Sequence, residues 1–131
     1  MGAMQKRKGA SGELEFSKVL LEAGFNARRG RQYCGTPDSP DVVSNVPGVH
    51  WEVKRCEAIT PYKALKQATD EADEGEMPIV AHRQNNKDWI AILTMSDLLT
   101  LIKRSIKLKN VQSNEPDKDG EQKIIQTKLE A

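Results

Sequence analysis

The chain has 131 residues, of which 37 % are apolar, and a formal net charge of +1. Its length suits a single domain with a modest core and a tail, and no apolar run approaches the about 18 residues that span a membrane. Two cysteines without CxxC spacing argue against a zinc site and a disulfide framework.

The charge is unevenly distributed along the chain. Residues 5–66 hold eleven Lys and Arg against seven Asp and Glu, whereas residues 67–131 hold nine against twelve. The first half is therefore better suited to a polyanion such as nucleic acid. The first residues contain no apolar leader, so we expect a cytoplasmic protein. We also expect a cloning scar and start over residues 1–4, the folded domain over 5–104 and a charged flexible tail over 105–131.

The predicted elements follow the order α-β-β-β-α-β-β-α. In the first half they are a helix over residues 11–23, capped by Ser11 and ended by Gly24, and strands over 25–28, 41–43 and 49–54. In the second half they are a helix from Thr60-Pro61 to near Gly75, strands over 78–83 and 89–93, and a helix from Ser96 through Ile102. This order predicts an α/β fold with a mixed β-sheet flanked by helices on both faces.

Residues 49–54 alternate strictly between apolar and polar side chains. His50, Glu52 and Lys54 therefore share one face of the strand, opposite Trp51 and its apolar neighbours. A solvated face of Glu and Lys on a hairpin is a common alternative. Asp41 begins the preceding strand and brings a second carboxylate to the same place, which favours a chemical site.

Glu13 lies on the same helical stripe as Phe16 and Leu20, which are expected to face the core. An ionised carboxylate at the edge of a core is unfavourable unless it is paired. Two interpretations remain open. Glu13 is a hydrated acid near the helix start, where the helix dipole favours it, or it points at the same pocket as Asp41 and Glu52.

Carboxylates gathered in this way are hard oxygen ligands of the kind that Mg²⁺ and Mn²⁺ prefer. A bound dication lowers the pKa of a water molecule and stabilises charge on phosphoryl oxygens. Lys54 would orient that water or neutralise the developing charge. The pattern therefore predicts phosphoryl chemistry at a divalent metal.

The segment Pro40-Asp41, followed after ten residues by Glu52-Val53-Lys54, resembles the signature of the PD-(D/E)XK nucleases. The pair Lys8-Gly9 that leads into Glu13 is similar to the archaeal-type Holliday-junction resolvase branch, and residues 27–41 are similar to small phage and prophage endonucleases. The resemblance covers about residues 6 to 103. It implies a restriction-endonuclease-like fold, a metal-dependent phosphodiesterase acting on DNA, and a homodimer with two active sites.

The resemblance also implies roles for individual residues. Glu13, Asp41, Glu52 and Val53 would hold Mg²⁺, with Mn²⁺ as a substitute, and Lys54 would be the catalytic lysine beside the same carboxylates. A second pair, Pro37-Asp38, competes with Pro40-Asp41. We favour Asp41 because two β-branched residues follow it directly, whereas Asp38 suits a turn. Asp38 and Gln67 are candidates for supporting positions beside the ligands, and for Gln67 a solvated helix face is the favoured alternative.

Basic residues near the motif are candidates for contacts with DNA phosphates, which give affinity without reading the base sequence. Ordinary surface charge is the alternative for each of them. The candidates are Lys6, Arg7, Lys8, Arg28, Arg29, Arg31, Gln32 and Arg55.

Together these patterns predict a Mg²⁺-dependent, structure-selective DNA endonuclease, with a Holliday-junction resolvase favoured. One alternative is a nicking or linear-duplex endonuclease without junction preference. Another is a DNA-binding dimer of the same fold that has lost catalysis. The choice depends on how two subunits are set apart, which a single sequence does not encode.

Overall fold

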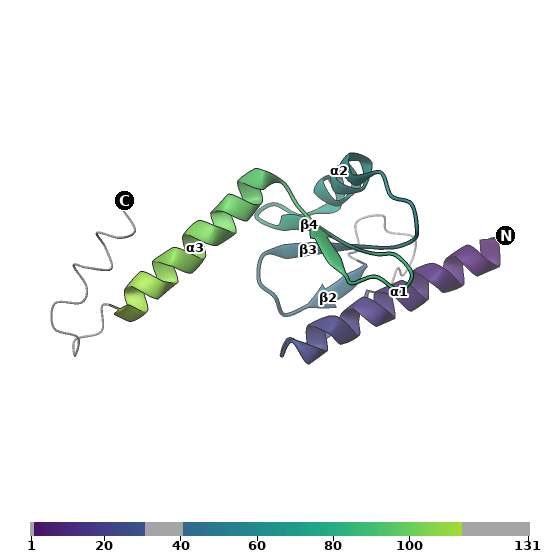
Figure 1. Cartoon of the computed structure of the whole chain (residues 1–131), viewed down its shortest axis with the longest axis horizontal. Coiled ribbons are helices and arrows are strands. Elements are labelled where there is room, and N and C mark those ends of the chain that lie inside the picture. Colours follow the sequence, from purple (N-terminus) through teal and green to yellow (C-terminus); the bar gives the residue numbers. More distant parts are fainter. Residues whose placement is uncertain (1, 31–40, 114–131) are drawn as a thin grey trace. The chain divides into compact units, whose positions relative to one another are not determined.

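The computed structural model describes the backbone of residues 2–30 and 41–113, and side chains from residue 11 onward within these ranges. The chain divides into two compact units, Met1–Leu93 and Thr94–Ala131. The first unit contains a five-stranded sheet with two helices, and the second contains the last helix (Figure 1).

The elements occur in the predicted order. They are α1 (Gly2–Glu22), β1 (Ala27–Arg29), β2 (Val42–Ser44), β3 (Val49–Arg55), α2 (Pro61–Glu71), β4 (Met77–Arg83), β5 (Ile90–Ile92) and α3 (Met95–Ser113). The strands lie side by side in the order β1-β2-β3-β4-β5. All neighbours are antiparallel except β3 and β4, which are parallel. The expected α/β fold with a mixed sheet is confirmed.

Helices α1 and α2 cover opposite faces of this sheet (Figure 1). Phe16 of α1 packs in a cluster with Ala81 of β4, whereas Ala68 of α2 packs with Val80 of the same strand. Because neighbouring residues of a strand point to opposite faces, these contacts place the two helices on different sides. The crossover through α2 carries the chain back to the end of the sheet where β3 begins. Strand β4 therefore runs parallel to β3.

Helix α1 ends as predicted and begins earlier than predicted. Gly24, with φ of +99°, follows its last turn; its N–H bonds to the carbonyl of Leu21, and that of Phe25 bonds to Leu20. The expected start at Ser11 is wrong, because the helix already runs from Gly2. Met, Gln, Lys, Arg and Ala before Ser11 are strong helix formers. Glu13 therefore lies in mid-helix, and the helix dipole does not explain it.

The other two helices also differ from expectation at their ends. Helix α2 begins at Pro61 as predicted, but it ends at Glu71 because Ala72 adopts an extended backbone. Helix α3 is capped two residues before the expected Ser96, since the hydroxyl of Thr94 accepts a bond from the Asp97 N–H at 3.1 Å. It continues to Ser113, so residues 105–113, expected to begin a flexible tail, are helical.

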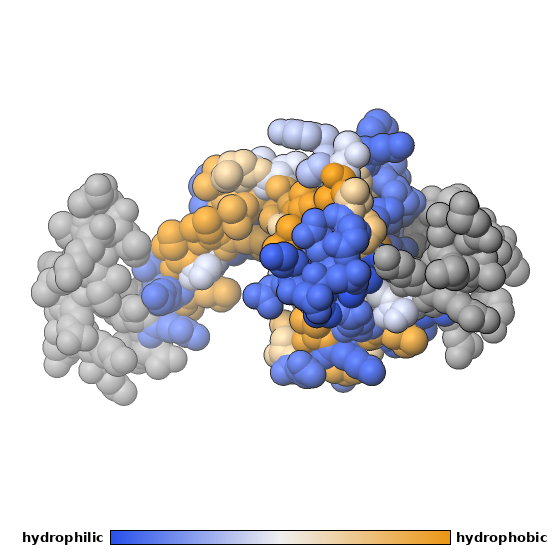
Figure 2. All heavy atoms as spheres, turned by 45° about the vertical axis from the view of Figure 1, so that its right-hand side comes forward, coloured by the Kyte–Doolittle hydropathy of each residue, from blue (hydrophilic) through white to orange (hydrophobic). Residues whose placement is uncertain are grey.

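Large apolar side chains are exposed along helix α3 (Figure 2). They include Leu98, Leu99, Ile102, Ile106, Leu108 and Val111.

Among the residues that the structure describes, no helix is long and apolar enough to cross a lipid bilayer.

Replacing Gly12 with alanine should destabilise the fold. Gly12 lies where α1 crosses β3, and a Cβ there would come within 2.5 Å of the Cβ of Arg55. Overpacking typically lowers the free energy of unfolding by about 1–3 kcal/mol. Alanine stabilises a helix over glycine by only about 1 kcal/mol, so the loss should outweigh the gain. Urea unfolding should show the loss, and Ser11→Ala, on the exposed side of the same turn, should not. A Gly12→Ala protein more stable than the wild type would contradict this packing.

Candidate functional site

Asp41 is held where three strands meet. Its N–H bonds to the carbonyl of Trp51 at 3.3 Å, and its own carbonyl accepts a bond from the N–H of Gly30 at 2.9 Å. Its Oδ2 accepts a bond from the N–H of Val53 at 2.8 Å. The carboxylate of Asp41 is therefore tied to the main chain between Glu52 and Lys54, the two polar residues of the motif.

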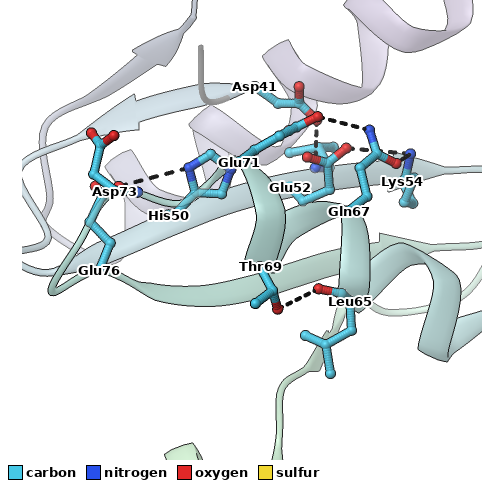
Figure 3. A network of polar contacts seen from close by, with 11 residues as sticks. Asp41, His50, Glu52, Lys54, Leu65, Gln67, Thr69, Glu71, Asp73 and Glu76 are labelled. Carbon is cyan, nitrogen blue, oxygen red and sulfur yellow. Dashed lines mark hydrogen bonds and ion pairs between the residues drawn. The ribbon is translucent and has the colours of Figure 1, made fainter. Parts of the chain in front are cut away.

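The predicted alternation along β3 is confirmed. Trp51 and Val53 pack toward the cluster formed by Phe16 of α1, while Lys54 contacts α2 on the other face. The Nζ of Lys54 lies 3.3 Å from Oε1 of Glu52 and donates to Oε1 of Gln67 at 3.0 Å. The lysine ammonium is thus fixed by one contact from its own strand and one from α2 (Figure 3).

Helix α2 adds a further carboxylate, Glu71, which the sequence analysis did not select. Its Oε1 accepts a bond from Nε2 of Gln67 at 3.3 Å, and Figure 3 shows its side chain reaching toward Asp41 and Glu52. Residues four positions apart lie on the same face of a helix. This spacing from Gln67 was the signal that could have identified Glu71.

The site contains more negative than positive groups. Burial raises the pKa of Glu52 to about 8, and the charge of Asp41 and a hydrogen bond with Glu71 add to the effect while Lys54 opposes it. Burial also raises the pKa of Asp41, against the opposing effects of the Val53 N–H and Lys54. Each buried carboxylate makes ionisation of its neighbour more difficult.

Glu13 approaches the same group from α1. Burial raises its pKa, a bond from Arg29 lowers it, and the charge of Asp41 raises it again. Its Oε2 accepts a bond from Nε of Arg29 at 2.5 Å. The structure therefore brings Glu13 beside Asp41. Its partner Arg29 is one of the residues that we expected to contact DNA.

The donor set fits a hard divalent cation. Oε2 of Glu52 is buried and has no hydrogen-bond partner among the described residues. The carboxylates have too few positive neighbours, and a bound Mg²⁺ or Mn²⁺ would supply the missing positive charge. Asp41 and Glu52 therefore lie together as candidate oxygen ligands, with Glu13 next to Asp41.

The arginines proposed for DNA lie in different surroundings. Arg28 is exposed on β1. Arg55 is largely buried: its Nε lies 3.3 Å from Oε2 of Glu15, and the same carboxylate also pairs with Arg83. Glu15 is half-buried between these two arginines. A DNA contact by Arg55 stays a prediction. In the structure Arg55 links β3 to α1 through its ion pair with Glu15.

Other candidates for DNA contact are only partly visible. Lys6, Arg7 and Lys8 lie on the first turns of α1, where the backbone alone is described. Outside the described residues lie Arg31 and Gln32, and also Asp38. The choice of Asp41 over Asp38 as the proposed metal ligand therefore depends on the contacts of Asp41 alone.

The sequence matches no protein-family model and no curated protein. Among solved structures, the chain is similar to Hjc, a Holliday junction resolvase from the archaeal hyperthermophile Archaeoglobus fulgidus. The TM-score is 0.48 at 20 % sequence identity, and the match covers 62 % of this chain and 72 % of that one. The functional assignment therefore depends on the site itself.

Proposed function

We propose that this chain is a Mg²⁺-dependent DNA endonuclease of the PD-(D/E)XK type. The observation that carries the proposal is the joint placement of Asp41, Glu52 and Lys54. Asp41 bonds to the N–H of Val53 at 2.8 Å, and the ammonium of Lys54 lies 3.3 Å from Glu52. The residues of the sequence signature thus form one cluster, as a shared chemical role requires.

Each residue of the cluster has a role that its contacts support. Asp41 and Glu52 hold the cation, with Glu13 and the main chain of Val53 beside them. When bound, the cation lowers the pKa of a water molecule and offsets negative charge on the phosphate. Lys54 places a positive charge next to the two carboxylates, where it can stabilise charge that develops on a phosphoryl oxygen.

Gln67 supports Lys54 without taking part in the chemistry. Its Oε1 accepts a bond from the lysine, and its Nε2 donates to Glu71. The amide therefore links the ammonium to the rest of α2.

The proposed substrate is branched DNA, which makes the enzyme a Holliday-junction resolvase. This part rests on the resemblance of residues 8–13 and 27–41 to resolvases and phage endonucleases. Exposed Arg28, together with the basic residues of α1, would contact phosphates of the junction arms. A homodimer in the cytoplasm of a bacterial host, encoded by a phage or prophage, would place two sites for paired cuts.

Cleavage of a four-way junction and of a matched linear duplex tests the proposal. Wild type, Asp41→Asn and Asp70→Asn are each assayed with Mg²⁺ and with EDTA. Asp70 is a matched control, since it is an exposed acid on α2 whose only described partner is Lys66, 2.7 Å away. We expect symmetric cuts in the junction alone, lost with EDTA and in Asp41→Asn, and retained in Asp70→Asn.

Each other outcome removes a defined part of the proposal. Equal cutting of the linear duplex would remove the junction preference and leave a general endonuclease. Cutting by Asp41→Asn at the wild-type rate would reject the active-site assignment. Binding of the junction without cutting would favour the inactive DNA-binding dimer.

A further inference from the structure

A mixed group of nitrogen and oxygen ligands lies beside the carboxylates described above. His50, Glu52 and Glu71 each offer one ligand atom, and these three atoms all lie within 4.8 Å of one another. His50 and Glu52 point to the same face of β3, and Glu71 faces them from α2 (Figure 3). The Nε2 of His50 is 3.9 Å from Oε2 of Glu71.

Two atoms of this group are buried without a partner. His50 is 2 % exposed, and its Nε2 has no hydrogen bond among the residues that the structure describes. Oε2 of Glu52, whose residue is also 2 % exposed, has none either. Buried polar atoms without partners are rare in native proteins and call for an unseen ion or water. The lack of hydrogen-bond partners for this imidazole and this carboxylate is therefore evidence for a bound ion that is independent of the clustering of acids.

The surroundings of His50 favour a metal-binding tautomer. Its Nδ1 lies 4.0 Å from Oε1 of Glu76. That oxygen is itself held by the N–H of Asp73 at 2.8 Å. A carboxylate on the Nδ1 side favours the proton on that nitrogen and leaves the lone pair of Nε2 directed at Glu71. Metal-ligating histidines commonly donate the other ring N–H to a carboxylate; at 4.0 Å the Glu76 carboxylate lies beyond hydrogen-bond distance of Nδ1 and acts on it through its charge.

The ligand types separate this group from the Mg²⁺ position. Imidazole nitrogen suits Zn²⁺ and other transition metals, whereas Mg²⁺ prefers oxygen and keeps several waters. One imidazole and two carboxylates therefore form a set that discriminates between the two kinds of ion. Glu52 has one oxygen near Lys54 and one without a partner, so it can belong to both positions.

We propose that His50, Glu52 and Glu71 form a second metal subsite that takes a transition-metal dication such as Zn²⁺. The subsite deepens the proposed function, because it shares Glu52 with the proposed Mg²⁺ position. A metal there connects β3 to α2. It would thereby also steady Gln67, which lies one helical turn before Glu71 and bonds to Lys54.

The histidine ring nitrogens of the full chain can test the subsite directly. The chain has only two histidines, His50 and His82, so long-range ¹H–¹⁵N spectra resolve each ring. Zn²⁺ is titrated into metal-free wild type, and a separate titration uses Mg²⁺. We expect Zn²⁺ to shift Nε2 of His50 and leave His82, whose Nε2 lies 2.9 Å from the carbonyl of Cys56, unchanged. Mg²⁺ should not produce the shift.

Calorimetry on variants gives a second readout. Glu71→Gln, which removes one of the three proposed ligands, should weaken Zn²⁺ binding at least about tenfold. Glu74→Gln, an exposed acid in the turn after α2, is the control and should bind Zn²⁺ as the wild type does. The subsite is overturned if Zn²⁺ leaves Nε2 of His50 unshifted, or if Glu71→Gln binds Zn²⁺ as tightly as the wild type. His50 and Glu71 would then be neighbours that bind no metal.

The subsite and the proposed function can fail separately. Ligation of Zn²⁺ by His50 in a protein that cuts no DNA with any metal would keep the subsite and reject the nuclease. DNA cleavage with Mg²⁺ in a protein whose His50 ignores Zn²⁺ would keep the nuclease and reject the subsite.

Discussion

Replacing Lys54 with methionine should lower the rate of junction cleavage by about 100- to 1,000-fold, the usual effect of removing one charge-stabilising donor. The wild-type ammonium is held 3.3 Å from Glu52 and 3.0 Å from Gln67, next to the proposed cation. Methionine keeps much of the volume of the side chain and removes its charge. Single-turnover cleavage with Mg²⁺ would measure the loss, and gel-shift binding with Ca²⁺ should remain close to wild type.

Two further variants of α2 sharpen the expectation. Lys66→Met removes an exposed lysine one position away from Gln67 and should cut at the wild-type rate. Gln67→Ala should cause a smaller fall than Lys54→Met, because the ammonium keeps its contact with Glu52. A fall in kcat with KM and melting temperature unchanged would identify Gln67 as a positioning residue. Equal rates for wild type and Lys54→Met would exclude Lys54 from the chemistry.

Local patterns were sufficient to predict much of the site. Alternation over residues 49–54 placed His50, Glu52 and Lys54 on one face, and the structure confirms this. The pair Thr60-Pro61 placed the start of α2, the helix that carries Gln67. These predictions succeed because the period of a strand and the start of a helix depend on residues adjacent in sequence.

The position of Glu71 on α2 could not be predicted in the same way. Five acids, from Asp70 to Glu76, follow one another closely, and the four-residue helical spacing selects Glu71 only once Gln67 is known to face β3. The choice of Glu71 depends on where α2 ends and on how it packs across the sheet. For the same reason His50 was placed on the correct face without a role, since its partner belongs to another element.

A long-range ion pair gives Arg55 a partner that local patterns did not reveal. Arg55 was assigned to DNA, and the structure pairs it with Glu15, which lies 40 positions earlier in the chain. Such a contact depends on how α1 crosses the sheet, where Gly12 allows the close approach. A basic residue near a motif is therefore weaker evidence for DNA contact than its charge suggests.

The free energy of unfolding of the metal-free protein should fall as the pH rises from about 4.5 to about 8. Burial raises the folded-state pKa of Glu52 to about 8, from an ordinary value of 4.5. Between these two values the folded state keeps a proton that the unfolded state releases, so stability decreases with pH. The contribution is complete below the lower value and is lost as the pH passes the upper one. Each pKa unit corresponds to about 1.4 kcal/mol, so the total fall should be several kcal/mol.

The groups that face Glu52 act on this titration in known directions. Asp41 and Glu71 raise its pKa and Lys54 lowers it, while His50 lies beside Glu52 on the same face of β3. The raised pKa of Asp41 adds a pH dependence of the same sign. A bound dication would oppose all of these carboxylate effects, because it favours the ionised forms.

Urea unfolding at pH 5 and pH 8.5 in EDTA, for wild type and Glu52→Gln, tests this expectation. The glutamine variant cannot ionise, so it should lose most of the pH dependence and be more stable than wild type at pH 8.5. Glu74→Gln, which replaces an exposed acid, should follow the wild type. Mg²⁺ at pH 8.5 should stabilise the wild type more than Glu52→Gln. Equal stability of wild type and Glu52→Gln at pH 8.5 would mean that the carboxylates are already compensated within the protein, and the argument that the site needs a cation would fail.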